Sequence, residues 1–208
     1  LFAKALVLES GGRRLILIVL DLVIVNRKYA DEIRRHVSAE LGVGVEAVMV
    51  HATQTHSAPS LGHFMVDDAF AGIPPELEWI RGGDPTYSAF VVETAVEAVR
   101  QARRALTPVK AGSASGIEGR LAFNRRAVMR DGSIAMPSRS WSGPLGPTNL
   151  RYIERPMDPE LGLLCLRGDD LRMRAVLANY TCHPVHVFPK RVVSADWPGA
   201  LADELNRR

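Results

Sequence analysis

The sequence predicts an α/β fold in which helices pack against a mixed β-sheet and a site lies at the ends of strands. Three observations support this prediction. Short apolar runs bounded by turn residues alternate with two amphipathic segments of helical period. Polar, histidine-bearing segments directly follow the apolar runs, where α/β proteins commonly place their sites. The composition, with 47% hydrophobic and 24% charged residues, is typical of a globular protein with a packed core.

Strands are expected where an apolar run meets a turn. Residues 2–8 and 14–20 flank Gly11-Gly12, which is the pattern of a β-hairpin. Residues 47–50 form a further short strand and lead directly into the first polar segment. The later expected strands are 109–117, 161–166 and 172–180, with a turn at 168–170.

Two amphipathic helices are expected between these strands, and a third near the end of the chain. Residues 27–41 carry apolar side chains at three- and four-residue spacing, and Gly42 ends this helix. The second helix begins with Asp84 as a cap and Pro85 in the first turn. The third starts within residues 194–198. Loops are expected at 62–83 and 138–159, because both stretches are rich in turn-forming residues.

Charge and hydropathy exclude several classes of protein. The net charge is +3, and the basic residues are spread along the chain, so we expect no nucleic-acid partner. The two cysteines are too few for a disulfide scaffold and match no zinc-ribbon spacing. The longest apolar run, 15–25, is interrupted by Asp21 and is too short to span a bilayer, so no transmembrane segment is expected.

Both ends of the chain fall inside expected elements. Leu1 lies in an apolar segment, and Arg208 lies in an expected helix. We therefore expect residues 1–208 to form a single, incomplete domain of catalytic type within a longer protein. A signal peptide could precede it.

Three polar clusters follow the expected strands. They are Gln54 to Ser57, Asn124-Arg125, and His183 with Asp196. Each has an ordinary interpretation: a structural histidine at a strand end, a surface turn, and a helix cap. Their occurrence together favours one cleft that is assembled from several strand ends. His186 is interpreted as structural or solvent-facing.

Together these segments resemble the motifs of the neutral/alkaline ceramidases, over nearly the whole chain. That family carries a Thr-His-Thr-His-Ser-Gly-Pro-like stretch, to which Thr-Gln-Thr-His-Ser-Ala-Pro at 53–59 is similar. Asn-Arg-Arg at 124–126 is similar to its Asn-Arg-Ser-Pro-like element. Residues 179–184 and 194–196 resemble, in the same order, its Asn-(Trp/Tyr/Phe)-x-x-His segment and its Ser-x-Asp element.

The resemblance implies a hydrolase that cleaves the amide bond of N-acylated sphingoid bases with one zinc ion. It makes His183 a zinc ligand, and it places His56 and Arg125 in the active site as catalytic residues. Asn124 and Ser57 are expected to contact the substrate. Two further zinc ligands, a glutamate and a tyrosine, are implied beyond the end of this chain. A secreted or periplasmic protein is compatible with the resemblance, and the residues leave the compartment open.

Gln54 departs from the family pattern, because it occupies the position of the first histidine ligand. An amide oxygen is a much poorer zinc ligand than imidazole. In an extended strand Gln54 and His56 would share a face while His51 points opposite, so His51 is not expected to replace the missing ligand. Zinc binding could therefore be weakened, shifted to His56, replaced by another metal, or lost with catalysis.

The predicted function is a zinc-dependent amide hydrolase resembling neutral ceramidase, acting on a small-molecule N-acyl amide or lipid. The alternative is a non-catalytic or metal-altered relative that binds a lipid-like or glycan ligand, and Gln54 favours it. A third interpretation, a serine hydrolase using Ser57, lacks the Gly-x-Ser-x-Gly elbow of such enzymes.

Overall fold

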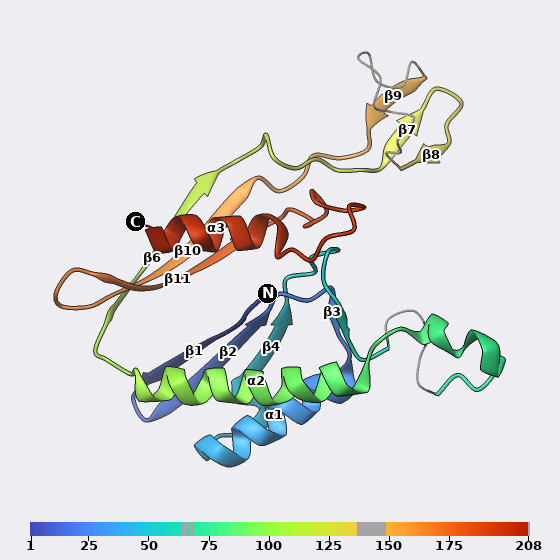
Figure 1. The fold of residues 1–208 in the computed structure, drawn as a ribbon. Coiled ribbons are helices and arrows are strands. Elements are labelled where there is room, and N and C mark those ends of the chain that lie inside the picture. Colours follow the sequence, from blue (N-terminus) through green and yellow to red (C-terminus); the bar gives the residue numbers. More distant parts are fainter. Residues whose placement is uncertain (64–65, 67–68, 137–148, 208) are drawn as a thin grey trace. The chain divides into compact units, whose positions relative to one another are not determined.

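A computed structural model describes residues 1–63, 66, 69–136 and 149–207 of the chain. The chain divides into two compact units (Figure 1). The first unit combines Leu1–Thr107 with Pro184–Arg208, and the second is Pro108–His183. That residues 1–208 belong to a single domain of a longer protein stays a prediction. No helix in the described ranges has the length and apolar character needed to cross a membrane.

A mixed three-stranded sheet forms the centre of the first unit, as the sequence predicted. Strands β1 (Ala3–Ser10) and β2 (Arg13–Leu20) form the expected antiparallel hairpin. Gly11 and Gly12 both have positive φ, which the two-residue turns of tight hairpins require. Strand β4 (Val48–Ala52) runs parallel to β2, so the strand order is β1-β2-β4.

Helices α1 (Arg27–Leu41) and α2 (Pro85–Arg104) cover one face of this sheet (Figure 1). The cap and stop signals in the sequence explain their bounds. The side chain of Asn26 accepts the N–H of Tyr29 to begin α1, and Gly42 ends it in the left-handed conformation. The Asp84 side chain caps α2 in the same way. The buried core between sheet and helices includes Ile16, Ile18, Leu20, Ile33, Val37, Ala95 and Val99.

Several smaller elements complete the first unit. The two-residue strands β3 (Ile24–Val25) and β5 (Ser60–Leu61) pair in parallel, and α3 (Asp196–Arg207) is the third expected helix. Two 3₁₀ helices, η1 (Val45–Ala47) and η2 (Pro75–Arg81), were not predicted. The expectation of loop throughout 62–83 is wrong for η2, because so short a helix leaves no 3.6-residue apolar period in the sequence.

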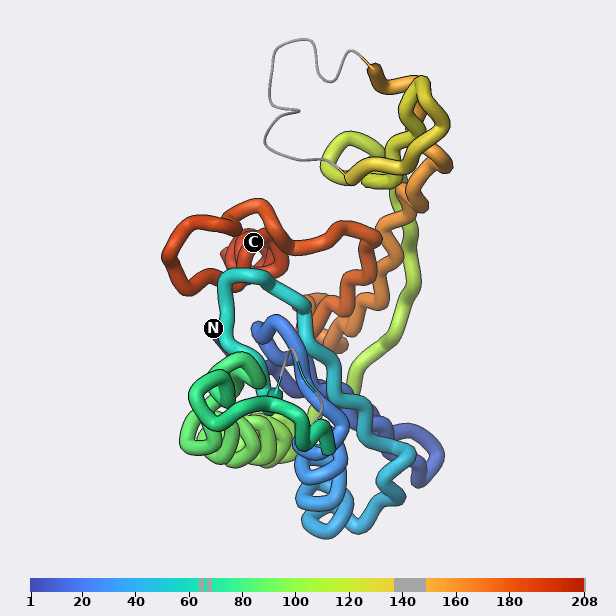
Figure 2. Tube along the Cα trace, turned by 90° about the vertical axis from the view of Figure 1, so that its right-hand side faces the viewer, coloured from blue at the N-terminus to red at the C-terminus, as the bar shows by residue number. Residues whose placement is uncertain are grey.

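The second unit is built from antiparallel strands. β10 (Glu160–Arg167) lies between β6 (Lys110–Ile117) and β11 (Met173–Tyr180), and the β10–β11 hairpin is the one predicted. The chain segments that leave β6 and enter β10 run side by side towards a smaller sheet (Figures 1 and 2). That sheet has the order β8 (Ile134–Ala135), β7 (Ala127–Met129), β9 (Leu150–Ile153).

The expected loop at 138–159 is only partly covered by the structure. Residues 137–148 lie outside the described residues. The expectation is wrong for β9, which pairs with β7 through Ala127–Ile153 and Val128–Tyr152. Such a short strand takes its identity from its pairing partner rather than from its own sequence pattern.

Candidate functional site

The segment that follows β4 and the loop that precedes α3 are tied together by hydrogen bonds within the first unit. The N–H of His56 donates to the carbonyl oxygen of Pro184 at 3.1 Å, and the N–H of Ser194 donates to that of Ser57 at 2.8 Å. The buried hydroxyl of Thr55 donates to the Ser194 carbonyl oxygen at 2.7 Å. The structure therefore joins the first polar cluster to the loop that carries Asp196.

The backbone turns sharply at Gln54. Strand β4 ends at Ala52, after which the N–H groups of Thr53 and Gln54 donate to carbonyl oxygens of Leu20 and Leu22. Gln54 has a φ of 66°, in the left-handed region that residues other than glycine rarely adopt. The expectation that Gln54 and His56 share a face of one strand is therefore wrong. The alternation of side chains stops at the end of the strand, and the Gln54 side chain is exposed.

His56 is held at its backbone and at its ring. Its N–H bonds to Pro184, and its ring meets the ring of Phe188 edge-on, with the centroids 5.8 Å apart. Pro184 and Phe188, the two ends of the segment 184–188, therefore both contact His56. The catalytic role predicted for His56 stays a prediction, and its side chain is half-buried in this setting.

Asp196 makes several of the hydrogen bonds that hold the loop leading into α3. Its side chain is fully buried and accepts the N–H groups of Val187 at 2.9 Å and Trp197 at 2.7 Å. His186 places its Nδ1 atom 3.3 Å from the same carboxylate. The hydroxyl of Ser194 accepts the N–H of Asp196 itself. This aspartate therefore does more than cap a helix, because it fixes residues on both sides of the loop.

The bonds to Asp196 also set its protonation. Burial by itself would raise the pKa of the Asp196 carboxyl, since it penalises the charged form. The N–H groups of Val187 and Trp197, together with the neighbouring His186, outweigh this effect and hold the pKa below its ordinary value. Asp196 is consequently a carboxylate at neutral pH.

The contact between His186 and Asp196 was not predicted from the sequence. His186 was interpreted as structural or solvent-facing, and it contacts a buried carboxylate while its side chain remains 52% exposed, which agrees with that interpretation. A histidine close to His183 and upstream of a Ser-x-Asp element was the only signal available. That signal is weak, because nothing local shows that the chain folds back to bring position 186 to position 196.

Ser57 contributes a buried hydroxyl. Its side chain is 8% exposed, and the Oγ atom has no hydrogen-bond partner among the residues that the structure describes. A buried hydroxyl without a partner is costly, which is compatible with the substrate contact predicted for it. Within the same residues no histidine accepts the Ser57 proton, and the serine-hydrolase interpretation stays untested.

Asn124 and Arg125 belong to the second unit, between β6 and β7. The Asn124 side-chain oxygen accepts the N–H of Arg126, as in the ordinary turn interpretation of an Asn-Arg pair. Arg126 pairs with Glu154, whereas the Arg125 side chain is exposed. The substrate contact expected of Asn124 and the catalytic role expected of Arg125 stay predictions.

Sequence comparison finds no matching family model and no matching curated protein. The similar solved structures include two ceramidases. A neutral ceramidase from Pseudomonas aeruginosa matches 91% of this chain at 20% identity with a TM-score of 0.62. A ceramidase complexed with C2 matches 91% at 21% identity with a TM-score of 0.64. The fold is ceramidase-like.

At this level of identity the likeness shows the fold alone. The resemblance inferred from the motifs is thereby confirmed for the architecture. The chain spans 28% and 27% of the lengths of these two ceramidases, so most of each matched protein has no counterpart in it.

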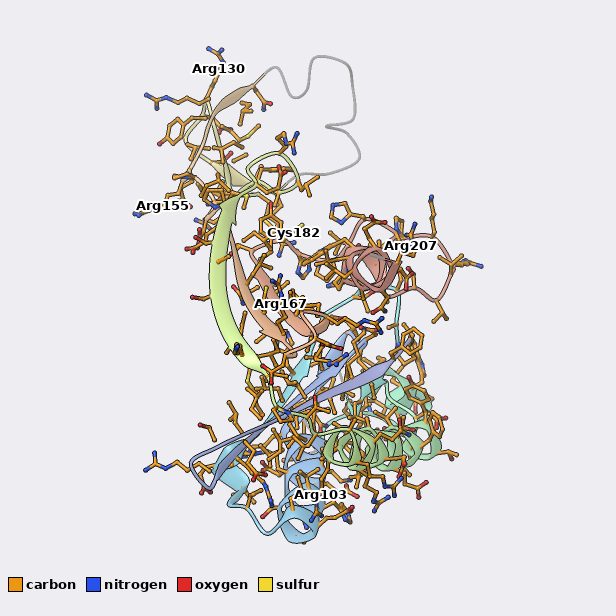
Figure 3. The ribbon with its side chains drawn as sticks, turned by 90° about the vertical axis from the view of Figure 1, so that its left-hand side faces the viewer. Arg103, Arg130, Arg155, Arg167, Cys182 and Arg207 are labelled. Carbon is orange, nitrogen blue, oxygen red and sulfur yellow. The ribbon has the colours of Figure 1, made fainter. Side chains whose placement is uncertain are left out.

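The residues of this ceramidase-like chain do not fit a complete zinc site. Within the described ranges, no three His, Cys, Asp or Glu side chains gather where they could hold a metal ion. Of the two ligand positions expected here, Gln54 offers only an exposed amide. His183 is the last residue of the second unit, directly before Pro184. Cys182, which is labelled in Figure 3, precedes it. The Cys182 thiol lies 3.9 Å from the Leu121 carbonyl oxygen.

Proposed function

We propose that this chain carries part of the active site of an amide hydrolase that acts on N-acylated lipids or related small-molecule N-acyl amides. The observation that carries the proposal is a pair of hydrogen bonds, from Thr55 to Ser194 and from Ser194 to Ser57, which we call the clamp. This clamp joins two segments that resemble ceramidase motifs, within a fold that is ceramidase-like. A purely structural relative has no need to keep a histidine, a buried hydroxyl and an oriented carboxylate on such a clamp.

Amide hydrolysis requires a proton carrier, donors for the oxyanion and contacts that orient the scissile bond. His56 can donate or accept a hydrogen bond or carry a proton, and its backbone and ring are held in place. The unpaired hydroxyl of Ser57 can donate to the substrate. Arg125 and Asn124 have the donor groups that an oxyanion needs, and their role is proposed on the resemblance alone.

Zinc dependence is proposed only for a longer protein that supplies further donors, with His183 as the ligand from this chain. The described residues by themselves do not complete a zinc site.

The alternative function is binding without turnover, by a relative that holds a lipid-like or glycan ligand. The exposed amide at Gln54, where the family pattern has a histidine, favours it. The two functions differ in whether the N-acyl bond is broken.

The test uses the full-length protein with an N-acylsphingosine that carries a fluorescent acyl chain. Wild type should release the labelled fatty acid, and His56→Ala should lower the rate at least about 100-fold, the usual cost of losing either an acid–base group or a hydrogen-bond donor to the oxyanion. His36→Ala is the matched control, because His36 lies exposed on α1. Binding of the intact substrate without any release would favour the alternative. Equal rates for His56→Ala and wild type would remove His56 from the reaction.

A further inference from the structure

We infer that His186 is a proton-transfer residue of this site and that Asp196 is its positioning residue. The inference rests on the proposed amide hydrolysis and names a group for which the motifs gave no role. It depends on the contacts of the pair, on its place beside His56, and on the buried hydroxyl of Ser57.

The pair is held in a defined arrangement. The Asp196 side chain is fully buried. Two backbone N–H groups hold its carboxylate independently of the contact with His186. Asp196 also keeps a left-handed backbone, with a φ of 53°. Aspartate adopts this region more readily than most residues because its short side chain can bond locally, and here the carboxylate accepts the N–H of Trp197.

This arrangement selects one form of the imidazole. An ionised carboxylate only accepts hydrogen bonds, so Nδ1 of His186 must carry the hydrogen that it shares with Asp196. In the neutral ring, Nε2 then keeps its lone pair and can accept a proton. A carboxylate behind the ring also stabilises the imidazolium that forms, as in hydrolases that use a carboxylate-held histidine as base. The side chain of His186 is 52% exposed, so the ring is not enclosed by the protein.

The chain also places His186 in the segment that contacts His56. Pro184 accepts the N–H of His56, and the ring of Phe188 contacts the ring of His56. His186 lies midway between these two contacts, so its Cα is within about 7 Å of the Cα atoms of both Pro184 and Phe188. The segment that holds His56 is therefore the segment that carries His186.

An independent observation concerns Ser57, in the segment that is hydrogen-bonded to Pro184 and Ser194. The Oγ atom of Ser57 is buried without a partner among the described residues, although its neighbours in the segment are bonded to Pro184 and Ser194. A substrate carbonyl or amide group would satisfy this hydroxyl. His186 and Ser57 thus belong to two segments, 184–194 and 55–57, that are hydrogen-bonded to each other.

The proposed proton transfers balance in atoms and charge. Nε2 of His186 takes a proton from water while the water oxygen bonds to the carbonyl carbon of the amide. When the C–N bond breaks, the leaving nitrogen takes that proton from the imidazolium, and the ring returns to its neutral form. The products are a carboxylic acid and an amine, and His56 hydrogen-bonds the substrate during the reaction.

The experiment compares wild type, His186→Ala, His186→Gln, Asp196→Asn and the double variant His186→Ala/Asp196→Asn in the full-length protein. The substrate is the fluorescent N-acylsphingosine, and circular dichroism verifies that each variant folds. His186→Ala should lower kcat about 100-fold, with KM changed less than twofold. Added imidazole should restore part of the kcat of this variant, because the half-exposed site admits a small base. Asp196→Asn should also lower kcat, and the double variant should be no slower than His186→Ala.

A merely structural pair would give a different pattern. The variants would then lose thermal stability but keep kcat, and imidazole would have no effect, which would overturn the inference while amide hydrolysis stands. His186→Gln separates packing from proton transfer, since it keeps a polar side chain of similar reach and should remain as slow as the alanine variant. If the wild type cleaves no N-acyl bond, the proposed function and this inference fall together.

Discussion

The hydroxyl of Thr55 donates a 2.7 Å hydrogen bond to the carbonyl oxygen of Ser194, a residue 139 positions further along the chain. The Thr55 side chain is fully buried, and its oxygen also accepts the N–H of Ser57 at 3.4 Å. One side chain thus helps to hold the segment with His56 against the loop with Asp196.

Thr55→Val tests the strength of this connection. Valine keeps the shape of threonine but removes the donor, so the Ser194 carbonyl oxygen loses its bond inside the protein. Urea unfolding should show a loss of about 1–3 kcal/mol, the usual cost of an unsatisfied buried group. Thr94→Val is the matched control, because the Thr94 hydroxyl bonds to the Phe90 carbonyl at an exposed position of α2. Equal effects of the two substitutions would contradict the importance assigned to Thr55.

The lowered pKa of Asp196 predicts a specific pH dependence of stability. A carboxyl whose pKa is lower in the folded state stabilises the fold fully above its unfolded pKa of about 4 and loses this contribution as the pH falls through the folded pKa. The Tm of the wild type should therefore fall between pH 7 and pH 2.5. The Tm of Asp196→Asn should fall less over the same range. Asp203→Asn, at an exposed position of α3, should retain the wild-type profile. Identical profiles for Asp196→Asn and wild type would show that this carboxylate is not linked to folding.

The position of Gln54 predicts a gain of zinc binding. In the full-length protein, Gln54→His restores the histidine of the family pattern, and imidazole is the better zinc ligand. Calorimetric titration should show tighter zinc binding than in the native protein, whereas Gln101→His, on the exposed surface of α2, should bind as the native protein does. If the native protein already binds zinc as tightly as Gln54→His, the metal uses other ligands. If neither form binds zinc, the non-catalytic alternative is favoured.

His183 is expected to be needed for metal retention in the full-length protein. His183→Ala should lower the zinc content measured by atomic absorption and should lose amide hydrolysis with it, because two or three remaining donors hold zinc poorly. His36→Ala serves again as the control. Unchanged zinc content in His183→Ala would show that His183 is not a ligand.

Local signals explain what could be predicted of the fold. The helix at 27–41 was placed at its exact bounds because Gly42 marks its end and the apolar side chains repeat at helical spacing. The hairpin around Gly11-Gly12 followed from turn residues between two apolar runs. Neither prediction needed any information from distant parts of the chain.

The features that were missed depend on distant contacts. The left-handed backbone of Gln54 follows from bonds that Thr53 and Gln54 make to Leu20 and Leu22, and a sequence pattern does not report them. The pairing of His186 with Asp196 likewise requires the loop between them to fold back. The motif resemblance identified the segments that meet, but only the structure shows which atoms hold them together.

Product analysis of an N-acylsphingosine incubated with the full-length protein in water enriched in oxygen-18 tests the central claim most directly. The proposal predicts equal amounts of free fatty acid and sphingoid base by mass spectrometry, with one heavy oxygen in the acid and none in the base. The His56→Ala and His186→Ala variants should form both products far more slowly. Recovery of intact substrate bound to the wild-type protein, with neither product formed, would contradict amide hydrolysis and leave a binding protein with a ceramidase-like fold.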